Sequence, residues 1–142
     1  MNPISYPIGK PKFADSGTTA AERAGWIEDI KSAPSLMRKA VGGLNAEQLG
    51  TRYREGGWTL RQVVHHVADS HTNAVMRFRW ALAEDEPQIK PYDEAAWAEL
   101  PDALSSPIEP SLGLLENLHH RWVALLEAMD ENAFARAYRH PE

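Results

Sequence analysis

Hydrophobic residues recur at helical spacing along most of the 142-residue chain. The clearest apolar stripe begins near residue 60, and a second begins near residue 111, with apolar side chains returning every three or four positions. No segment shows the sustained alternation of apolar and polar residues that marks a half-buried strand. The pattern therefore predicts an all-α protein.

Capping patterns predict where the first helix begins. Thr19 and Glu22 have the spacing of a capping box, in which each side chain bonds to the backbone N–H of the other residue. A helix is expected over residues 20–41. Pro34 lies inside this span and predicts a kink or a break near Ser32, because proline has no backbone N–H to donate.

The same type of signal predicts two further long helices. Thr59 and Gln62 form a second capping-box pattern and predict a helix over residues 60–84. Ser111 is expected to cap a third helix that ends near Met129. Together with the first helix, these elements indicate the antiparallel arrangement of a helical bundle.

The remaining segments are expected to be less regular. Residues 86–110 are rich in proline and read as a long connection containing one short helical turn. A connection of this length is typical of a crossover in a four-helix bundle. Residues 130–137 are expected to form one or two more turns. Residues 1–17 are expected to form an extended arm without secondary structure.

Helical periodicity separates the histidines by direction. His71 lies within the apolar stripe of the second helix and His119 within that of the third, whereas His120 points outward. An inward-facing histidine is usually a neutral core residue with a hydrogen bond to one ring nitrogen. His65, His66 and His71 do not have the spacing of three or four residues that lets one helix supply two metal ligands.

A polar stripe on the second helix leaves two interpretations open. His66 shares this stripe with Ser70, Asn73 and Arg77 at spacings of three and four. Such a stripe is either a solvated face or the lining of a wet pocket between helices. Periodicity does not choose between these two interpretations, and the solvated face is the commoner case for His66 and more so for His65.

Composition excludes several classes of protein and site. The chain has no cysteine, so a metal site would use histidine, aspartate, glutamate or water. A net charge of −5 without a basic patch disfavours nucleic-acid binding. No apolar run approaches the roughly 20 residues that span a bilayer, and the N-terminus lacks the apolar core of a secretory signal. A cytoplasmic protein is expected.

Several strings in order carry a family resemblance: "YREGGWTLRQVVHHVADSHTNAVMRFRWAL", then "PYDEAAWAEL", then "LLENLHHRWVALLEAM". Together with "ISYPIGK" and "YRHPE", they resemble the YfiT-like metal-dependent hydrolases of the DinB superfamily over essentially the whole chain. The resemblance implies one DinB-like domain over residues 1–142, folded as a four-helix bundle of up-down-down-up type with a long crossover.

The resemblance also implies one divalent metal, zinc or nickel, held by three histidines in a pocket open to solvent. One ligand would come from the second helix, at the second histidine of the "HH" pair, which is His66. The other two would come from a His-x-x-x-His pair on the last helix. These 142 residues contain no such pair. The last helix is therefore expected to be missing or truncated, and a homodimer is expected to cover the face it would leave open.

The resemblance implies a hydrolase that acts on a small molecule through a metal-activated water. The carboxylates that could orient ligands or act as base are Asp69, Asp93 and Glu94. The candidate binding residues are Ser70, Asn73 and His119. Two alternatives stay open: a transferase that uses a low-molecular-weight thiol, as in bacillithiol-transferase-like relatives, and a non-catalytic shortened bundle that acts as a binding or dimerisation module.

Overall fold

The computed structural model describes residues 17–141, which are all-α and contain no strand. The predicted fold class is confirmed. The expected extended arm at residues 1–17 lies, except for Gly17, outside this part of the chain. The long helices are α1 (Ala20–Val41), α3 (Leu60–Ala83) and α6 (Glu109–Glu127). The short helices are α2 (Ala46–Leu49), α4 (Glu94–Ala98), α5 (Pro101–Ser105) and α7 (Glu131–Phe134).

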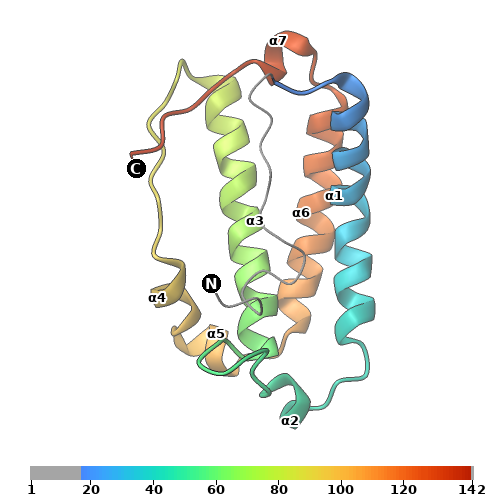
Figure 1. Cartoon of the computed structure of the whole chain (residues 1–142), viewed down its shortest axis with the longest axis vertical. Coiled ribbons are helices and arrows are strands. Elements are labelled where there is room, and N and C mark those ends of the chain that lie inside the picture. The colour runs from blue at the N-terminus through green and yellow to red at the C-terminus, as the bar shows by residue number, and fades with distance from the viewer. Residues whose placement is uncertain (1–16, 142) are drawn as a thin grey trace.

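Helix α6 packs against both α1 and α3 (Figure 1). Helices α3 and α6 run in the same direction, and α1 runs in the opposite direction. Two parallel neighbours need a long return connection, and the segment from Glu84 to α5 provides it by running back along α3. The long connection predicted over residues 86–110 is therefore the crossover of the bundle.

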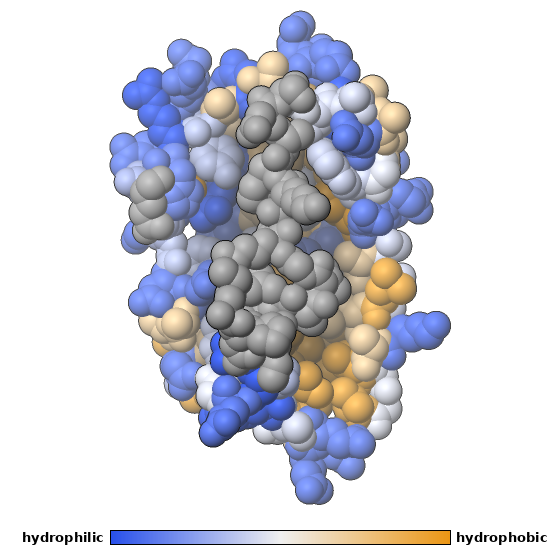
Figure 2. Space-filling view, in the orientation of Figure 1, coloured by the Kyte–Doolittle hydropathy of each residue, from blue (hydrophilic) through white to orange (hydrophobic). Residues whose placement is uncertain are grey.

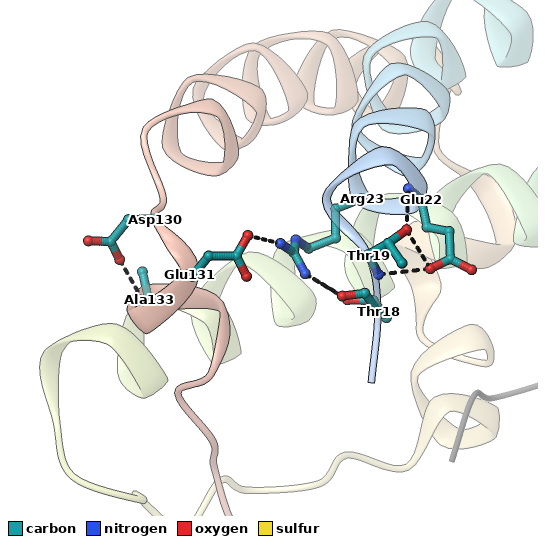
Figure 3. Close-up of polar contacts among 7 residues, drawn as sticks. All are labelled: Thr18, Thr19, Glu22, Arg23, Asp130, Glu131 and Ala133. Atoms are coloured by element: carbon teal, nitrogen blue, oxygen red, sulfur yellow. Dashed lines mark hydrogen bonds and ion pairs between the residues drawn. The ribbon is translucent and has the colours of Figure 1, made fainter. Parts of the chain in front are cut away.

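The N-terminal end of α1 has the predicted capping box (Figure 3). The Glu22 backbone N–H donates to the Thr19 hydroxyl at 3.2 Å, and the Thr19 N–H donates to the Glu22 carboxylate at 2.8 Å. Arg23, one residue later, donates to the Thr18 carbonyl at 2.7 Å and pairs with Glu131 of α7. The last short helix is therefore tied to the start of the first long one.

Pro34 is accommodated within α1: of the two outcomes predicted near Ser32, a kink or a break, the break is wrong. The helix continues from Ala20 to Val41, and Pro34 is buried. Proline leaves the carbonyl of Ile30 without its usual helical donor four residues later. His119 of α6 replaces that donor, with its Nδ1 2.5 Å from the Ile30 oxygen. A side chain from the neighbouring helix thus satisfies the backbone group that proline leaves free.

The third long helix begins earlier than expected. Helix α6 starts at Glu109 with Pro110 in its first turn, a position where proline needs no backbone donor. Ser111 is therefore inside the helix, and its predicted role as N-cap is wrong. Its hydroxyl instead lies 2.7 Å from Nδ1 of His65 on α3. Helix α3 spans Leu60–Ala83, close to the predicted range.

The core lies where α3 and α6 meet. Val75 of α3 packs with Trp122 and Leu126 of α6, and Ile27 and Ile30 of α1 pack against this cluster. Within α1 itself only Pro34 is buried. Figure 2 shows hydrophobic side chains at the surface over the lower end of α1. Among the described residues, one face of α1 packs against the core and the opposite face is left exposed.

None of the helices over residues 17–141 combines the length and the hydrophobicity that crossing a membrane requires.

Candidate active site around His66

His66 differs from the other histidines of the two central helices that are not exposed, namely His65, His71 and His119. His65 and His119 have hydrogen-bond partners for both ring nitrogens, and His71 has one for Nδ1. Neither ring nitrogen of His66 has a hydrogen-bond partner within residues 17–141. The ring is half-buried and lies against Trp58, with a centroid distance of 4.6 Å and a tilt of 50°. Within the described part of the chain, His66 is therefore held by an aromatic contact that leaves both nitrogens available to a ligand.

The loop before α3 places Trp58 against His66. A bridge joins Arg52 to Thr59, and the Tyr53 N–H donates to the Trp58 carbonyl at 3.1 Å. Gly56 has φ +66°, which a residue with a side chain adopts at a cost. The capping box of Thr59 then starts the helix directly after Trp58. The loop is thus closed by backbone bonds at the point where the helix begins.

A polar recess of about 350 Å³ opens beside His66. The side chains lining it come from the loop, from α3 and from α4. Its lining residues are Tyr53, Arg54, Gly56, Gly57, Trp58, His66 and Glu94. Glu94 is the one carboxylate among them, so the recess joins an imidazole, a guanidinium and a carboxylate. An imidazole and a carboxylate are groups that can take part in acid–base chemistry.

Gln62 fixes the position of α4 and hence of Glu94. Its side-chain oxygen accepts from the backbone N–H of Thr59 at 2.9 Å, which completes the capping box. Its side-chain nitrogen donates to the Ala98 carbonyl at the end of α4, at 2.8 Å. The sequence indicates only the capping role. The second contact explains why Gln62 is almost completely buried.

Of the three predicted catalytic carboxylates, only Glu94 lies in the recess with His66. Asp93 is the N-cap of α4, and its carboxylate accepts from the Ala96 N–H at 2.9 Å. Asp69 is not part of the recess lining, and Asp102 of α5 is close enough to affect the pKa of its carboxyl group. Asp93 is therefore engaged in capping α4, and Asp69 lies outside the recess.

The predicted binding residues also lie apart from the recess. Ser70 and Asn73 are half-buried on α3 and do not line it, and the Asn73 amide donates to the Asp69 carbonyl at 2.9 Å. His119 is buried between the long helices. The polar stripe of α3 does not form the lining of a single pocket: only its first member, His66, reaches the recess.

His65, His71 and His119 have structural partners that fix their tautomers. The Ile30 carbonyl can only accept, so His119 carries its proton on Nδ1 and accepts at Nε2 from Nδ1 of His71, 2.6 Å away. Nε2 of His65 donates to the Ser106 carbonyl at 3.2 Å. The pKa of His71 is lowered by burial first, and then by His119 and His66. These three imidazoles are engaged in contacts between helices and with the segment before α6.

Asp69→Asn is expected to raise the midpoint of thermal unfolding at pH 7. Burial, followed by the Asp102 carboxylate, raises the pKa of Asp69 above its ordinary value of 3.8. The folded state therefore binds the proton more tightly than the unfolded state, and the ionised carboxylate weakens the fold as pH rises through the folded pKa. The gain from asparagine should be present at pH 7 and disappear below about pH 4.

Thermal unfolding followed by circular dichroism at pH 7 and pH 3.5 tests this expectation. Asp85→Asn, at an exposed position after α3, is the matched control and should leave the difference between the two pH values unchanged. A gain for Asp69→Asn that persists at pH 3.5 would contradict the role of ionisation.

Sequence patterns missed Tyr53, Arg54 and Trp58 as residues of the site. The available signal was local: a pair of glycines immediately before a capping box. Such a pair indicates a tight turn that returns the chain to the helix it is about to enter. The three side chains around this turn then face the first turns of that helix, where His66 is located.

Comparison with known proteins agrees with the fold. The family model of the DinB superfamily matches residues 29–142. The chain belongs to the DinB superfamily. It is 53% identical over 136 residues to a protein of Geobacillus thermodenitrificans named "Putative metal-dependent hydrolase", a match that covers 96% of this chain and 76% of that relative. It is 45% identical over 139 residues to YfiT of Bacillus subtilis, covering 98% of this chain and 78% of YfiT.

A solved structure of this DinB superfamily member, YfiT, superimposes with a TM-score of 0.95 at 44% identity, covering 98% of this chain and 79% of the YfiT chain. That protein is described as a probable metal-dependent hydrolase with an unusual four-helix bundle topology. The fold of the present chain is therefore that of the YfiT bundle, with parallel α3 and α6 joined by the long crossover.

His66 and Glu94 could provide some of the ligands that a metal site needs, but not a complete set. Within residues 17–141 no group of three histidine, aspartate or glutamate side chains could hold a metal ion. A catalytic metal usually has three protein ligands. His66, with Glu94 in the same recess, is the donor that fits such a site, because neither of its ring nitrogens has a hydrogen-bond partner among the described residues. The His-x-x-x-His pair implied by the resemblance is not among the described residues.

Proposed function

We propose that the protein is a metal-dependent hydrolase of small molecules and that His66 is one ligand of its divalent metal. The observation that supports this function is the environment of the imidazole: it lies in a polar recess, and neither of its nitrogens has a partner in the described residues. Zinc and nickel suit imidazole and carboxylate ligands in a chain that has no cysteine. The names of the relatives support the class of reaction.

The chain's own residues would have distinct roles in such a reaction. A divalent metal held at His66 supplies positive charge that lowers the pKa of bound water toward neutrality. Trp58 fixes the plane of the His66 ring by its aromatic contact. Glu94 is the carboxylate of the recess and is in position to take up a proton there. The remaining metal ligands would come from groups outside the described residues.

Chelation is expected to abolish ester or amide hydrolysis by the purified protein, and added zinc or nickel to restore it. The assay offers an electrophilic substrate with and without a low-molecular-weight thiol and identifies the products by mass spectrometry. Hydrolysis that survives chelation would exclude a metal-dependent mechanism. The control contains the same metal concentration without protein.

The same assay separates hydrolysis from thiol transfer. The chain has no cysteine, so any thioether product must contain the added thiol. If the hydrolysis product dominates when thiol is present, the assay supports the hydrolase. A product that carries the thiol, formed at the expense of hydrolysis, would replace this function with transfer.

A further inference from the structure

Arg54 lines the recess, and its guanidinium has no carboxylate partner among the described residues. Several other arginines pair with glutamates, namely Arg23, Arg38 and Arg139. Arg54 forms no ion pair within residues 17–141. Its Nε donates to the Tyr53 hydroxyl at 3.0 Å, and one terminal nitrogen donates to the Glu55 carbonyl at 3.3 Å. A guanidinium has five N–H donors, so most of the donors of Arg54 are available to a ligand.

The position of Arg54 is fixed by its own loop. Its guanidinium carbon lies 5.2 Å from the centroid of the Tyr53 ring, and its backbone carbonyl accepts from the Gly57 N–H at 3.0 Å. A Cβ atom at Gly57 would lie 2.8 Å from Cγ of Arg54 and 2.8 Å from the Tyr53 ring. The absence of a side chain at Gly57 thus allows both residues to pack over the loop.

The surroundings of Arg54 define the kind of molecule it would contact. Arg54 and His66 line the same recess, and Glu94, which also lines it, forms no ion pair with Arg54. A second recess of about 370 Å³ shares Tyr53 and Trp58 with the first and has a mainly apolar wall completed by Leu60 and Val63. A cationic group therefore adjoins an apolar surface at the site.

We propose that Arg54 is an oxyanion-binding residue of the His66 recess, and that the substrate carries a carboxylate or phosphate group on an apolar body. This inference rests on the proposed function, since His66 would hold the reacting end of the substrate. Arginine binds both oxyanions through paired, charge-assisted hydrogen bonds. Trp58, Leu60 and Val63 provide the apolar contact beside it. A neutral analogue of the substrate would leave the donors of Arg54 without an acceptor.

Binding measurements in the absence of added metal test the proposal. The probes are phenylacetate, phenyl phosphate and the neutral 2-phenylethanol, titrated in the presence of a chelator. The indole N–H signal of Trp58 in an NMR spectrum, assigned with a Trp58→Phe variant, reports occupancy. At least one anion is expected to bind about tenfold or more tightly than the alcohol. Preference for phenylacetate or for phenyl phosphate then identifies the oxyanion. Equal binding of all three probes would overturn the proposal.

Variants assign the anion preference to Arg54. Arg54→Gln is expected to reduce anion affinity about tenfold, to that of the alcohol, while Arg121→Gln on the exposed side of α6 should leave it unchanged. Gly57→Ala should also weaken anion binding by displacing Arg54 without changing its charge. Its control is Gly113→Ala, where an added Cβ meets nothing within 4 Å. Unchanged anion binding in Arg54→Gln would overturn the proposal, whatever the result for Gly57→Ala.

Failure of the oxyanion site at Arg54 and failure of the proposed hydrolase function give different experimental results. Anion preference at Arg54 that persists in a protein without metal-dependent hydrolysis would support the oxyanion site and reject the hydrolase. Metal-dependent hydrolysis in a protein that binds the alcohol as tightly as the anions would support the hydrolase and reject the oxyanion site.

Discussion

Replacing His119 with leucine is expected to lower the free energy of unfolding by about 2–4 kcal/mol, because two partly buried polar groups lose their partner together. The first is the Ile30 carbonyl, which accepts from Nδ1 of His119 at 2.5 Å. The second is Nδ1 of His71, which donates to Nε2 of His119 at 2.6 Å. Leucine has a similar size, so the measured loss reports hydrogen bonding more than packing. Chemical denaturation at pH 7.5 measures it.

The reason for this dependence lies in Pro34, and a double-mutant cycle tests it. Pro34→Ala restores a backbone N–H four residues after Ile30, which gives the carbonyl a donor within its own helix. In that background His119→Leu should be less destabilising by about 1–2 kcal/mol. If the effects of the two substitutions on the free energy of unfolding are additive, His119 does not replace the backbone donor that Pro34 lacks.

A neighbouring histidine provides the control for this cycle. His120 lies on the same helix and is exposed, so His120→Leu should change the free energy of unfolding by less than about 0.5 kcal/mol. A loss as large as that of His119→Leu would show that the effect belongs to the helix segment and not to the buried hydrogen bonds.

Local signals predict the helices well because they act within one or two turns. The capping boxes at Thr19 and Thr59 fix the starts of α1 and α3, since each is made of residues three positions apart. The inward direction of His119 likewise follows from helical periodicity. Ser111 shows where such signals fail: its hydroxyl binds His65 of another helix, and its position along the chain cannot reveal that partner.

The site depends on contacts between segments distant in sequence, and these are harder to predict. Pro34 predicts a break in α1 only if nothing replaces the missing donor, and the replacement lies 89 positions from Ile30. Glu94 reaches the recess because Gln62 holds the end of α4, an interaction across 36 positions. The assignment of His66 as a ligand comes from family resemblance, and the lack of a hydrogen-bond partner for its ring nitrogens within residues 17–141 is a separate reason for the same choice. That assignment stays a prediction.

His66→Ala is expected to reduce the affinity for zinc or nickel by at least about 100-fold. Loss of a residue that only supports a ligand commonly reduces metal affinity by about 10–100-fold, so loss of the ligand itself should reduce it at least as much. His65 cannot take over, because its nitrogens are bound to Ser111 and Ser106. Calorimetric titration of the metal-free protein measures the affinity, with metal analysis of the purified protein as a second readout.

The control variant also loses one histidine, so it contains as many histidines as His66→Ala. His120→Ala removes an exposed imidazole from α6 and should leave metal affinity unchanged, which excludes binding by surface histidines. Circular dichroism shows whether each variant keeps its helices. Equal metal affinity in His66→Ala and the unmodified protein would reject His66 as a ligand. A loss confined to His66→Ala would place the metal in the recess that holds Glu94 and Arg54, where a bound oxyanion and the reacting end of the same substrate lie within one site.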